Sequence, residues 1–204
     1  MNKDSLRDIK KEATAHALAS AALELARERG MDGFVVDDVV KRAGYSRRTF
    51  ANHFSCKEEA VAVAAVSFRG FNDAEHILDD LPADAVPIDI LHQLLRTQFT
   101  AELFRNLREL VRLAKQYPTL EPHILNVFQG LQTDALKVLG DLCKERYPEG
   151  YSHLIVGAVY GAVLPVVDGS INVLLPGQAA TEYPSSITFD QYMGMVFGYL
   201  RNGF

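Results

Sequence analysis

The sequence has few of the residues that mark secreted or metal-binding proteins. Its 204 residues include no tryptophan and only two cysteines, Cys56 and Cys143. Two cysteines so far apart provide neither a disulfide framework nor the spacing of a metal site, so we expect reduced thiols and a cytoplasmic protein. We also expect no signal peptide, because the chain starts with the polar segment MNKDSLRDIKKEA.

Long apolar segments are also scarce. The longest apolar run, residues 154–167, reads LIVGAVYGAVLPVV and is followed by Asp168. Fourteen residues are fewer than a membrane-spanning helix needs, so the run predicts no membrane partner.

The motifs of common enzyme classes are missing too. The chain has no H-E-x-x-H, no nucleotide-binding glycine loop, no nucleophile elbow and no Cys-x-x-Cys. Its six histidines are too scattered to form a local metal motif. We therefore expect no enzyme, no cofactor and no metal site.

Charge is distributed unevenly along a chain whose net charge is −5. Residues 1–60 contain 11 Lys or Arg against 10 Asp or Glu, and the remainder contains 10 against 16. This balance argues against a protein that coats nucleic acid along its whole surface and favours a local contact near the N-terminus.

Most segments of the chain have the periodicity of helices, and none has the alternation of a strand. We predict an all-α fold of about nine helices. The expected ranges are 8–29, 37–43, 46–54, 55–80, 88–104, 106–117, 119–147, 151–175 and 188–204.

Two short helical patterns meet at Gly44 in the window 36–57, VDDVVKRAGYSRRTFANHFSCK. Gly44 can adopt the positive φ that the turn of a helix-turn-helix needs. Ser46 can cap the second helix, and Phe50 and Phe54, four residues apart, can pack inward together. The pattern predicts a DNA-binding helix-turn-helix.

The outward face of this second helix carries side chains that can read bases. Arg47 and Arg48 can bind guanine, and Asn52 can bind adenine, in the major groove. His53 and Lys57 lie where contacts to the DNA backbone are expected. Two alternatives remain open: a helical protein-interaction module whose basic hairpin binds an acidic partner, and a small helical enzyme.

The window and its surroundings resemble the N-terminal domain of the tetracycline-repressor (TetR) family. The resemblance covers roughly residues 10–62. It is carried by ELARERG at 24–30, VDDV at 36–39, KRAGYSRRTF at 41–50 and HFSCKE at 53–58. By position, it implies that Arg47, Arg48, Thr49 and Asn52 lie on the recognition helix and that His53 and Lys57 contact phosphates. It also sets Tyr45 at the turn, where it touches the DNA backbone or simply packs.

The same resemblance implies a homodimeric, one-component transcriptional regulator. We expect a three-helix DNA-binding domain in residues 1–60 and a helical domain in residues 61–204 that binds a small-molecule effector and dimerises. The partners would be a palindromic DNA operator, the effector and a second copy of the chain, and repression is the family default. Four positions depart from the family pattern. Val35 replaces a capping Thr, Ala51 an aromatic residue, Ala26 a Phe and Val40 an Ala.

Several polar residues interrupt the apolar helices of the C-terminal part, as the orienting groups of a ligand pocket do. The candidates for effector contact are Arg112, His123, Asn126, Tyr160 and Asp168. Taken alone, each of these residues is more often an ordinary surface or core residue than a ligand contact. Asp168 could pair across a dimer interface, bind a cationic ligand or lie exposed at the helix edge.

Small residues follow one another at helical spacing on the apolar helix expected at 151–175. Gly157 and Gly161 would allow another helix to approach closely. Met193 and Phe197 lie on the last helix and would add apolar contacts. We expect these four residues in a four-helix dimer interface, the alternative being a core within one chain.

Overall fold

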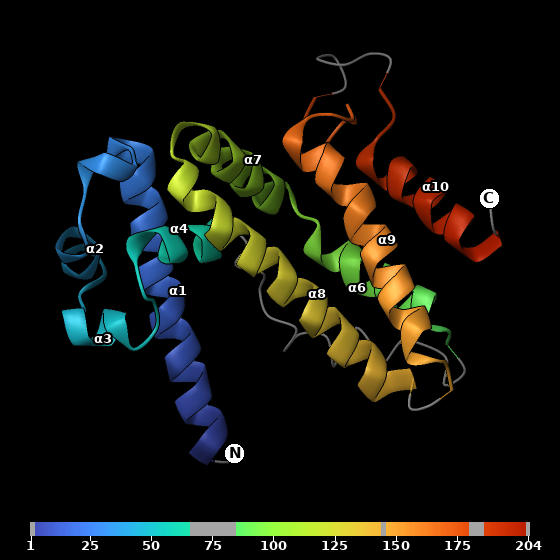
Figure 1. The fold of residues 1–204 in the computed structure, drawn as a ribbon, viewed down its shortest axis with the longest axis horizontal. Helices are drawn as coiled ribbons and strands as arrows, with labels where there is room; N and C mark the ends of the chain where they lie inside the picture. Colours follow the sequence, from blue (N-terminus) through green and yellow to red (C-terminus); the bar gives the residue numbers. More distant parts are fainter. Residues whose placement is uncertain (1–2, 66–84, 144–145, 180–185, 203–204) are drawn as a thin grey trace. The chain divides into compact units, whose positions relative to one another are not determined.

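The protein is described from a computed structural model that covers residues 3–65, 85–143, 146–179 and 186–202. Within these ranges it has nine α-helices, two 3-10 turns and no strand, which confirms the predicted all-α class (Figure 1). The elements are α1 (Lys3–Arg29), η1 (Met31–Gly33), α2 (Val36–Ala43), α3 (Arg47–Ala51), α4 (Lys57–Ala65), α6 (Pro87–Gln98), α7 (Ala101–Gln116), η3 (Pro118–Leu120), α8 (Glu121–Cys143), α9 (Glu149–Asp168) and α10 (Phe189–Asn202).

The chain forms two compact units. The first unit comprises Met1–Ser67 and Glu109–Val127, and the second comprises Phe68–Arg108 and Phe128–Phe204. Helices α7 and α8 therefore each contribute residues to both units. The predicted division into domains 1–60 and 61–204 stays a prediction.

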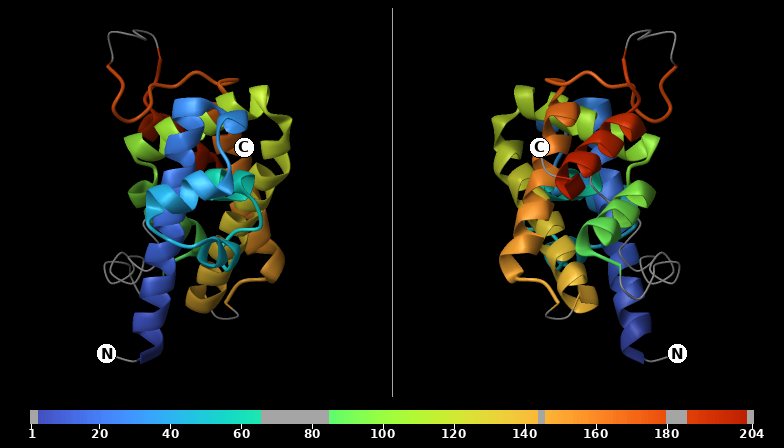
Figure 2. Two further views of the ribbon diagram at one scale, coloured as in Figure 1. Left: turned by 90° about the vertical axis from the view of Figure 1, so that its left-hand side faces the viewer. Right: turned by 90° about the vertical axis from the view of Figure 1, so that its right-hand side faces the viewer.

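The core of the first unit forms where α1 packs against α4 and α2. The apolar face predicted for α1 is buried, with Leu18 and Ala22 fully inaccessible and Leu25 nearly so. On α4, Ala60 and Val61 are also fully buried. Small side chains on both helices allow close packing. The first turns of α1 extend beyond α2, α3 and α4 (Figure 2).

The second unit is built around α6, α9 and α10, which contact one another. Helices α9 and α10 run side by side in opposite directions, and the Tyr192 hydroxyl donates to the Ala162 carbonyl across 2.9 Å (Figures 1 and 2). Phe99, Phe104 and Phe189 form an aromatic cluster in this unit. The ring centroids of Phe104 and Phe189 lie 4.6 Å apart, and those of Phe99 and Phe189 lie 5.0 Å apart.

Several predicted helix boundaries were wrong. Helix α1 begins at Lys3 rather than at residue 8, and α3 ends at Ala51 rather than at residue 54. The expected break near residue 105 lies at Phe99 and Thr100, where the Thr100 hydroxyl accepts a hydrogen bond from the Leu103 N–H and so caps α7. Helix α9 ends at Asp168 rather than at residue 175, because Gly169 adopts a left-handed conformation with φ 85°. The predicted end of the fourth helix, beyond residue 65, lies outside the described residues.

The prediction that the apolar run of residues 154–167 is too short to cross a membrane was wrong for the helix that contains it, α9. Over Gly150–Asp168 it is long and apolar enough to cross one by length and composition, and a third of that window is buried inside the protein. Core helices pass the same test, so this single helix is weak evidence for membrane insertion.

Candidate nucleic-acid interface

The turn between α2 and α3 has the geometry that the sequence predicted. Gly44 ends α2 with φ 75° and ψ 27°, a conformation that side-chain-bearing residues rarely adopt. The N–H groups of Gly44 and Tyr45 both donate to the Val40 carbonyl, the latter across 2.9 Å. These bonds close α2 and direct the chain into α3.

Helix α3 is positioned by a cap at its start and by two buried rings. The Ser46 Oγ accepts from the Thr49 N–H across 3.1 Å, which confirms the predicted cap. Phe50 and Phe54 are almost completely buried, with ring centroids 5.6 Å apart. The aromatic pair fixes which face of α3 points into the first unit, and therefore which face points outward.

The outward face of α3 displays most of the predicted DNA contacts. Ser46, Arg47, Arg48 and Asn52 are exposed, as is Ala51. Tyr45, at the turn, has 38% of its surface exposed. Three predicted contacts are less accessible: Thr49, His53 and Lys57 are half-buried. The Thr49 Oγ1 lies 2.8 Å from the Ser46 Oγ, so this hydroxyl also takes part in the cap.

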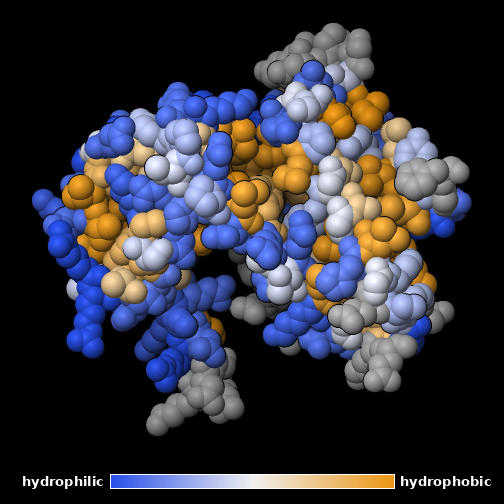
Figure 3. Space-filling view, viewed as in Figure 1, coloured by the Kyte–Doolittle hydropathy of each residue, from blue (hydrophilic) through white to orange (hydrophobic). Residues whose placement is uncertain are grey.

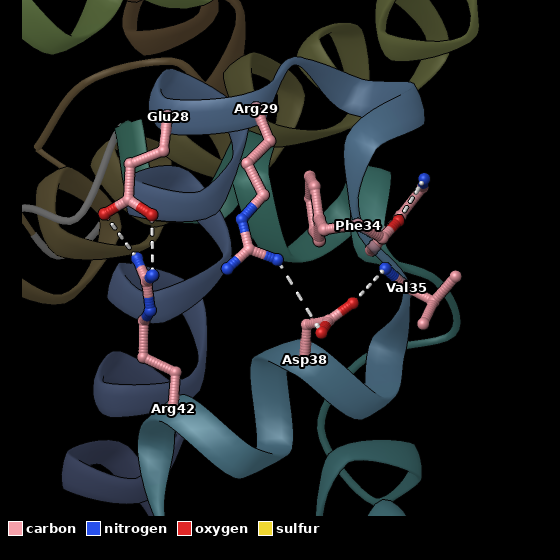
Figure 4. Close-up of polar contacts among 7 residues, drawn as sticks. Glu28, Arg29, Phe34, Val35, Asp38 and Arg42 are labelled. Carbon is pink, nitrogen blue, oxygen red and sulfur yellow. Dashed lines mark hydrogen bonds and ion pairs between the residues drawn. The ribbon is translucent and has the colours of Figure 1, made fainter.

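Helix α2 begins without a side-chain cap from Val35, as its sequence implied. Asp38 in its first turn instead bonds back to the backbone of Val35. The Val35 N–H donates to Asp38 Oδ2 across 3.0 Å, and Arg29 Nη1 lies 3.7 Å from Asp38 Oδ1 (Figure 4). Asp38 thus satisfies a free backbone N–H before α2 and also links α2 to α1.

Arg42 belongs to the basic window but is engaged inside the first unit. Its Nη1 and Nη2 donate to the two carboxylate oxygens of Glu28 across 2.8 and 2.6 Å (Figure 4), and Nη1 lies 3.7 Å from Glu24. This hydrogen bonding lowers the pKa of Glu28 and raises the pKa of Arg42, so both stay charged at neutral pH. Arg42 therefore holds α2 against α1.

Lys57, a predicted phosphate contact, is also occupied within the protein. Its ammonium donates to the carbonyls of Met31 and Phe34, the latter across 2.9 Å, and lies 4.8 Å from the centroid of the Phe34 ring. A phosphate contact would require Lys57 to give up at least part of this arrangement. The sequence offered no sign of it, because Met31 and Phe34 are more than 20 residues away.

Arg47 is paired with Asp37 of α2 while remaining on the surface. Arg47 Nε and Nη2 donate to the two Asp37 carboxylate oxygens, and the Nη2–Oδ2 distance is 2.5 Å. The hydrogen bond lowers the pKa of Asp37 and raises the pKa of Arg47. The Arg47 side chain nevertheless keeps 71% of its surface exposed.

The five residues predicted to contact an effector do not form one cluster. Arg112, His123 and Asn126 lie in the first unit, whereas Tyr160 and Asp168 lie in the second. Arg112 is exposed and pairs with Glu109 at 2.8 Å, and Asn126 is exposed. His123 is half-buried, with its Nε2 3.5 Å from the Cys56 Sγ.

The two candidates in the second unit differ from each other in accessibility. Burial, and to a lesser extent the negative charge of Asp134, raises the pKa of Tyr160, which keeps its phenol neutral. Asp168 is exposed at the end of α9, and its Oδ1 accepts from the Ser170 N–H across 2.8 Å. Exposure at the helix end was one of the three alternatives for Asp168.

A cavity that the sequence did not reveal lies between α6 and α10 in the second unit. Its volume is about 250 Å³. It is lined by His92, Leu95, Arg96, Phe99, Phe189, Asp190, Met193, Gly194 and Phe197. It lacks all five predicted effector residues. Within the described part of the chain, no group of three His, Cys, Asp or Glu residues could hold a metal ion.

His92 is a titratable residue in the wall of this cavity. The His92 ring stacks on Phe197 with centroids 4.1 Å apart, and Arg201 Nη2 lies 3.2 Å from His92 Nδ1. Because a guanidinium only donates, Nδ1 accepts and the neutral ring carries its proton on Nε2. Burial, together with the charges of Arg201 and Arg96, lowers the pKa of His92.

The four predicted dimer residues divide into two pairs. Gly157 and Gly161 are exposed on α9, in line with Leu154 and Leu164, and apolar side chains gather over this helix at the surface (Figure 3). Met193 and Phe197 instead are buried, with 5% and 0% of their surface exposed. These two belong to the core within the chain, because they face the side of α10 that contacts α6.

Comparisons with known proteins give a family match to the N-terminal part of the chain and a similar solved structure. Residues 18–64 match the family described as bacterial regulatory proteins, tetR family. No curated protein matches the chain. A crystal structure of a protein described as a TetR-family transcriptional regulator from Mesorhizobium loti MAFF303099 aligns over 92% of this chain and 95% of that chain, with 15% sequence identity and a TM-score of 0.49.

Proposed function

The chain belongs, through its N-terminal domain, to the tetR family of bacterial regulatory proteins, and we propose that it is a ligand-responsive repressor that binds a palindromic operator as a homodimer. The family is one of DNA-binding transcriptional regulators rather than enzymes. One observation carries the proposal: within the matched segment, α3 buries Phe50 and Phe54 and turns Arg47, Arg48 and Asn52 outward.

On this proposal α3 enters the major groove. Arg47, Arg48 and Asn52 would contact base edges, since arginine suits guanine and asparagine suits adenine. Tyr45, Ser46 and Thr49 would contact DNA at the start of the helix. His53 and Lys57 would contact the backbone. The set combines contacts that position the protein with contacts that read sequence.

A homodimer would present two copies of α3 to successive major grooves, about 34–36 Å apart. The exposed apolar face of α9, which we define as Leu154, Gly157, Gly161 and Leu164, supports this part of the proposal. The two leucines expose 67% and 41% of their surface, and a Cβ added at either glycine would meet no atom of another element within 4 Å. Another helix could therefore approach the α9 backbone closely.

The effector would act through the helical domain, for which we retain the boundaries 61–204, in a cytoplasmic protein. The cavity between α6 and α10 supports a small ligand, because it combines aromatic walls with the charged groups of Arg96 and Asp190. An effector that binds better to a dimer with a different separation of its DNA-binding domains lowers operator affinity. The effect cannot exceed the difference between its affinities for the two states.

Selection of bound sequences from a random DNA pool tests the proposal directly. We expect enrichment of an inverted repeat, footprint protection of both half-sites and release of the DNA by a small molecule from a screened library. Steep salt dependence alone would also fit an acidic protein partner, so the symmetric footprint is the decisive result. Enrichment of no sequence would contradict the proposal.

A further inference from the structure

The ion pair between Asp37 and Arg47 joins the two helices of the helix-turn-helix. Asp37 lies in the first turn of α2, and Arg47 is the first residue of α3. The guanidinium donates through Nε and Nη2 to both carboxylate oxygens. Two parallel hydrogen bonds define the plane of the guanidinium as well as its distance, so Asp37 sets the orientation of Arg47.

Stability of the fold is a poor explanation for this pair. The two side chains expose 56% and 71% of their surface, and exposed ion pairs contribute little to folding. The helices are already held by the buried Phe50 and Phe54 and by the hydrogen bonds to the Val40 carbonyl. Arg42 differs in that its own side chain is only 28% exposed and its partner lies on α1, although that partner, Glu28, is 51% exposed.

The pairing leaves one edge of the guanidinium available. A guanidinium has five N–H donors, and Asp37 occupies the edge formed by Nε and Nη2. The edge formed by Nη1 and the remaining Nη2 proton can still donate two parallel hydrogen bonds. Guanine presents the matching pair of acceptors, O6 and N7, in the major groove.

The carboxylate also changes what Arg47 can bind without reading sequence. Attraction of a free arginine to phosphates is independent of sequence. A neighbouring negative charge weakens that attraction and repels the DNA backbone. Asp37 should therefore reduce binding to unrelated DNA more than binding to a site with guanine opposite Arg47.

We propose that Asp37 is a specificity-determining positioning residue, which orients Arg47 to read a guanine with its free edge and lowers the affinity for non-cognate DNA. The proposal rests on the DNA-binding function proposed above. It assigns to an acidic residue of α2, outside the recognition helix, a role in sequence discrimination.

The test compares affinities rather than a single affinity. The full-length wild-type protein and Asp37→Asn are titrated with the selected operator, with operators in which each guanine of the half-site is replaced in turn, and with unrelated DNA. We expect Asp37→Asn to bind unrelated DNA more tightly. Its discrimination against replacement of one guanine should fall roughly ten-fold, within the range that a bidentate arginine–guanine contact supplies.

Two matched variants separate orientation from simple charge. Asp32→Asn makes the same charge change at another exposed site of the first unit, so it should shift the affinities for all DNA alike and leave discrimination unchanged. In an Arg47→Ala background, Asp37→Asn should cause no further loss of discrimination. Loss of discrimination from Asp37→Asn that depends on Arg47 supports the proposal.

The outcomes that overturn the proposal are distinct from failure of the proposed function. If the wild-type protein selects an operator but Asp37→Asn discriminates as well as wild type, Asp37 does not position Arg47. The same conclusion follows if Asp37→Asn loses discrimination equally with and without Arg47. If the wild-type protein selects no DNA sequence at all, the proposed function fails, and this proposal fails with it.

Discussion

The two units differ in the kind of side chain that they expose. Around the helix-turn-helix of the first unit, charged side chains pair between helices: Arg42 with Glu28, and Arg47 with Asp37. In the second unit, α9 and α10 carry exposed apolar side chains, including Leu154, Leu164, Met195 and Tyr199. An exposed apolar patch of this kind marks a protein contact, whereas a polar surface with free donors suits DNA. The charged surface around the helix-turn-helix therefore suits DNA, whereas the exposed apolar side chains of α9 and α10 suit a contact with another protein. The first unit also exposes single apolar side chains, such as Val35 and Leu125.

The largest test of this comparison is a charge placed on the exposed apolar face of α9. We expect Gly161→Glu to give a monomer by size-exclusion chromatography with light scattering. Its affinity for a full operator should fall about 100-fold or more, because the second half-site no longer binds intramolecularly. Affinity for an isolated half-site should stay unchanged.

Gly140→Glu is the matched control for this variant. Gly140 is also exposed on a helix, and a Cβ added there meets no atom of another element within 4 Å. It should remain dimeric. If Gly161→Glu also stays dimeric, the exposed α9 face is not the interface, and the contrast between the two units loses its functional meaning.

Substitutions at two glycines test how closely the first unit is packed around its backbone. Gly30 has φ 69° and ψ 171°, a region that is nearly restricted to glycine, and a Cβ there would lie 2.5 Å from the Tyr117 Oη. We expect Gly30→Ala to lower the free energy of unfolding by about 2–3 kcal/mol in urea titrations. Gly44→Ala, in open space, should cost about 1–2 kcal/mol from its positive φ alone.

The variant Tyr117→Phe isolates the steric part of the Gly30 effect. Removing the hydroxyl leaves the nearest ring carbon 3.5 Å from the added Cβ. The double variant should therefore recover part of the stability lost in Gly30→Ala. Equal losses with and without the hydroxyl would show that the backbone conformation alone accounts for the cost.

Arg48 tests the outward face of α3. Arg48→Ala should weaken operator binding by about 1–3 kcal/mol, the usual contribution of a specific base contact, and leave the dimer intact. Fluorescence anisotropy with labelled operator measures the change, and Lys41→Ala, at an exposed residue of α2, is the control for loss of one positive charge. Equal effects of both variants on operator and unrelated DNA would remove Arg48 from the base-reading set.

The smallest expected effect concerns pH and the second unit. Because burial lowers the pKa of His92 in the folded protein, the unfolded chain takes up this proton first as the pH falls. The contribution of His92 to the free energy of unfolding should therefore be fully present above about pH 6.5, the ordinary pKa of histidine. It should be lost as the pH falls from there through the lowered folded-state pKa.

Thermal melts of His92→Asn should lose this component of the pH dependence. His153→Asn, at an exposed residue of the same unit, should retain it. An identical pH profile for wild type and His92→Asn would show that His92 is not the titrating group.

Much of the candidate interface could be predicted because it depends on close neighbours in the chain. The turn at Gly44, the cap by Ser46 and the buried pair Phe50 and Phe54 each involve residues no more than four apart. Such patterns can be read directly from spacing. The roles of Arg42 and Lys57 could not, because their partners Glu28 and Met31 are 14 and 26 residues distant.

The second unit shows the same limit more strongly. The apolar periodicity of α10 was visible, but not which partner its apolar face packs against, and Met193 and Phe197 proved to belong to the core. The cavity between α6 and α10 joins residues about 100 positions apart, so no local pattern could indicate it.

The sequence by itself determined the all-α class and the helix-turn-helix, since these follow from periodicity, caps and turn residues that act over a few positions. The motifs of residues 18–64 also sufficed to match the tetR family. Only the tertiary structure decided which positive charges remain outward. Coulombic and hydrogen-bonded pairing depends on distance in space, and folding brings Glu28 to Arg42 and Asp37 to Arg47. Within the basic window, Arg42 is thereby paired with α1, whereas Arg47 is paired with α2 and stays exposed.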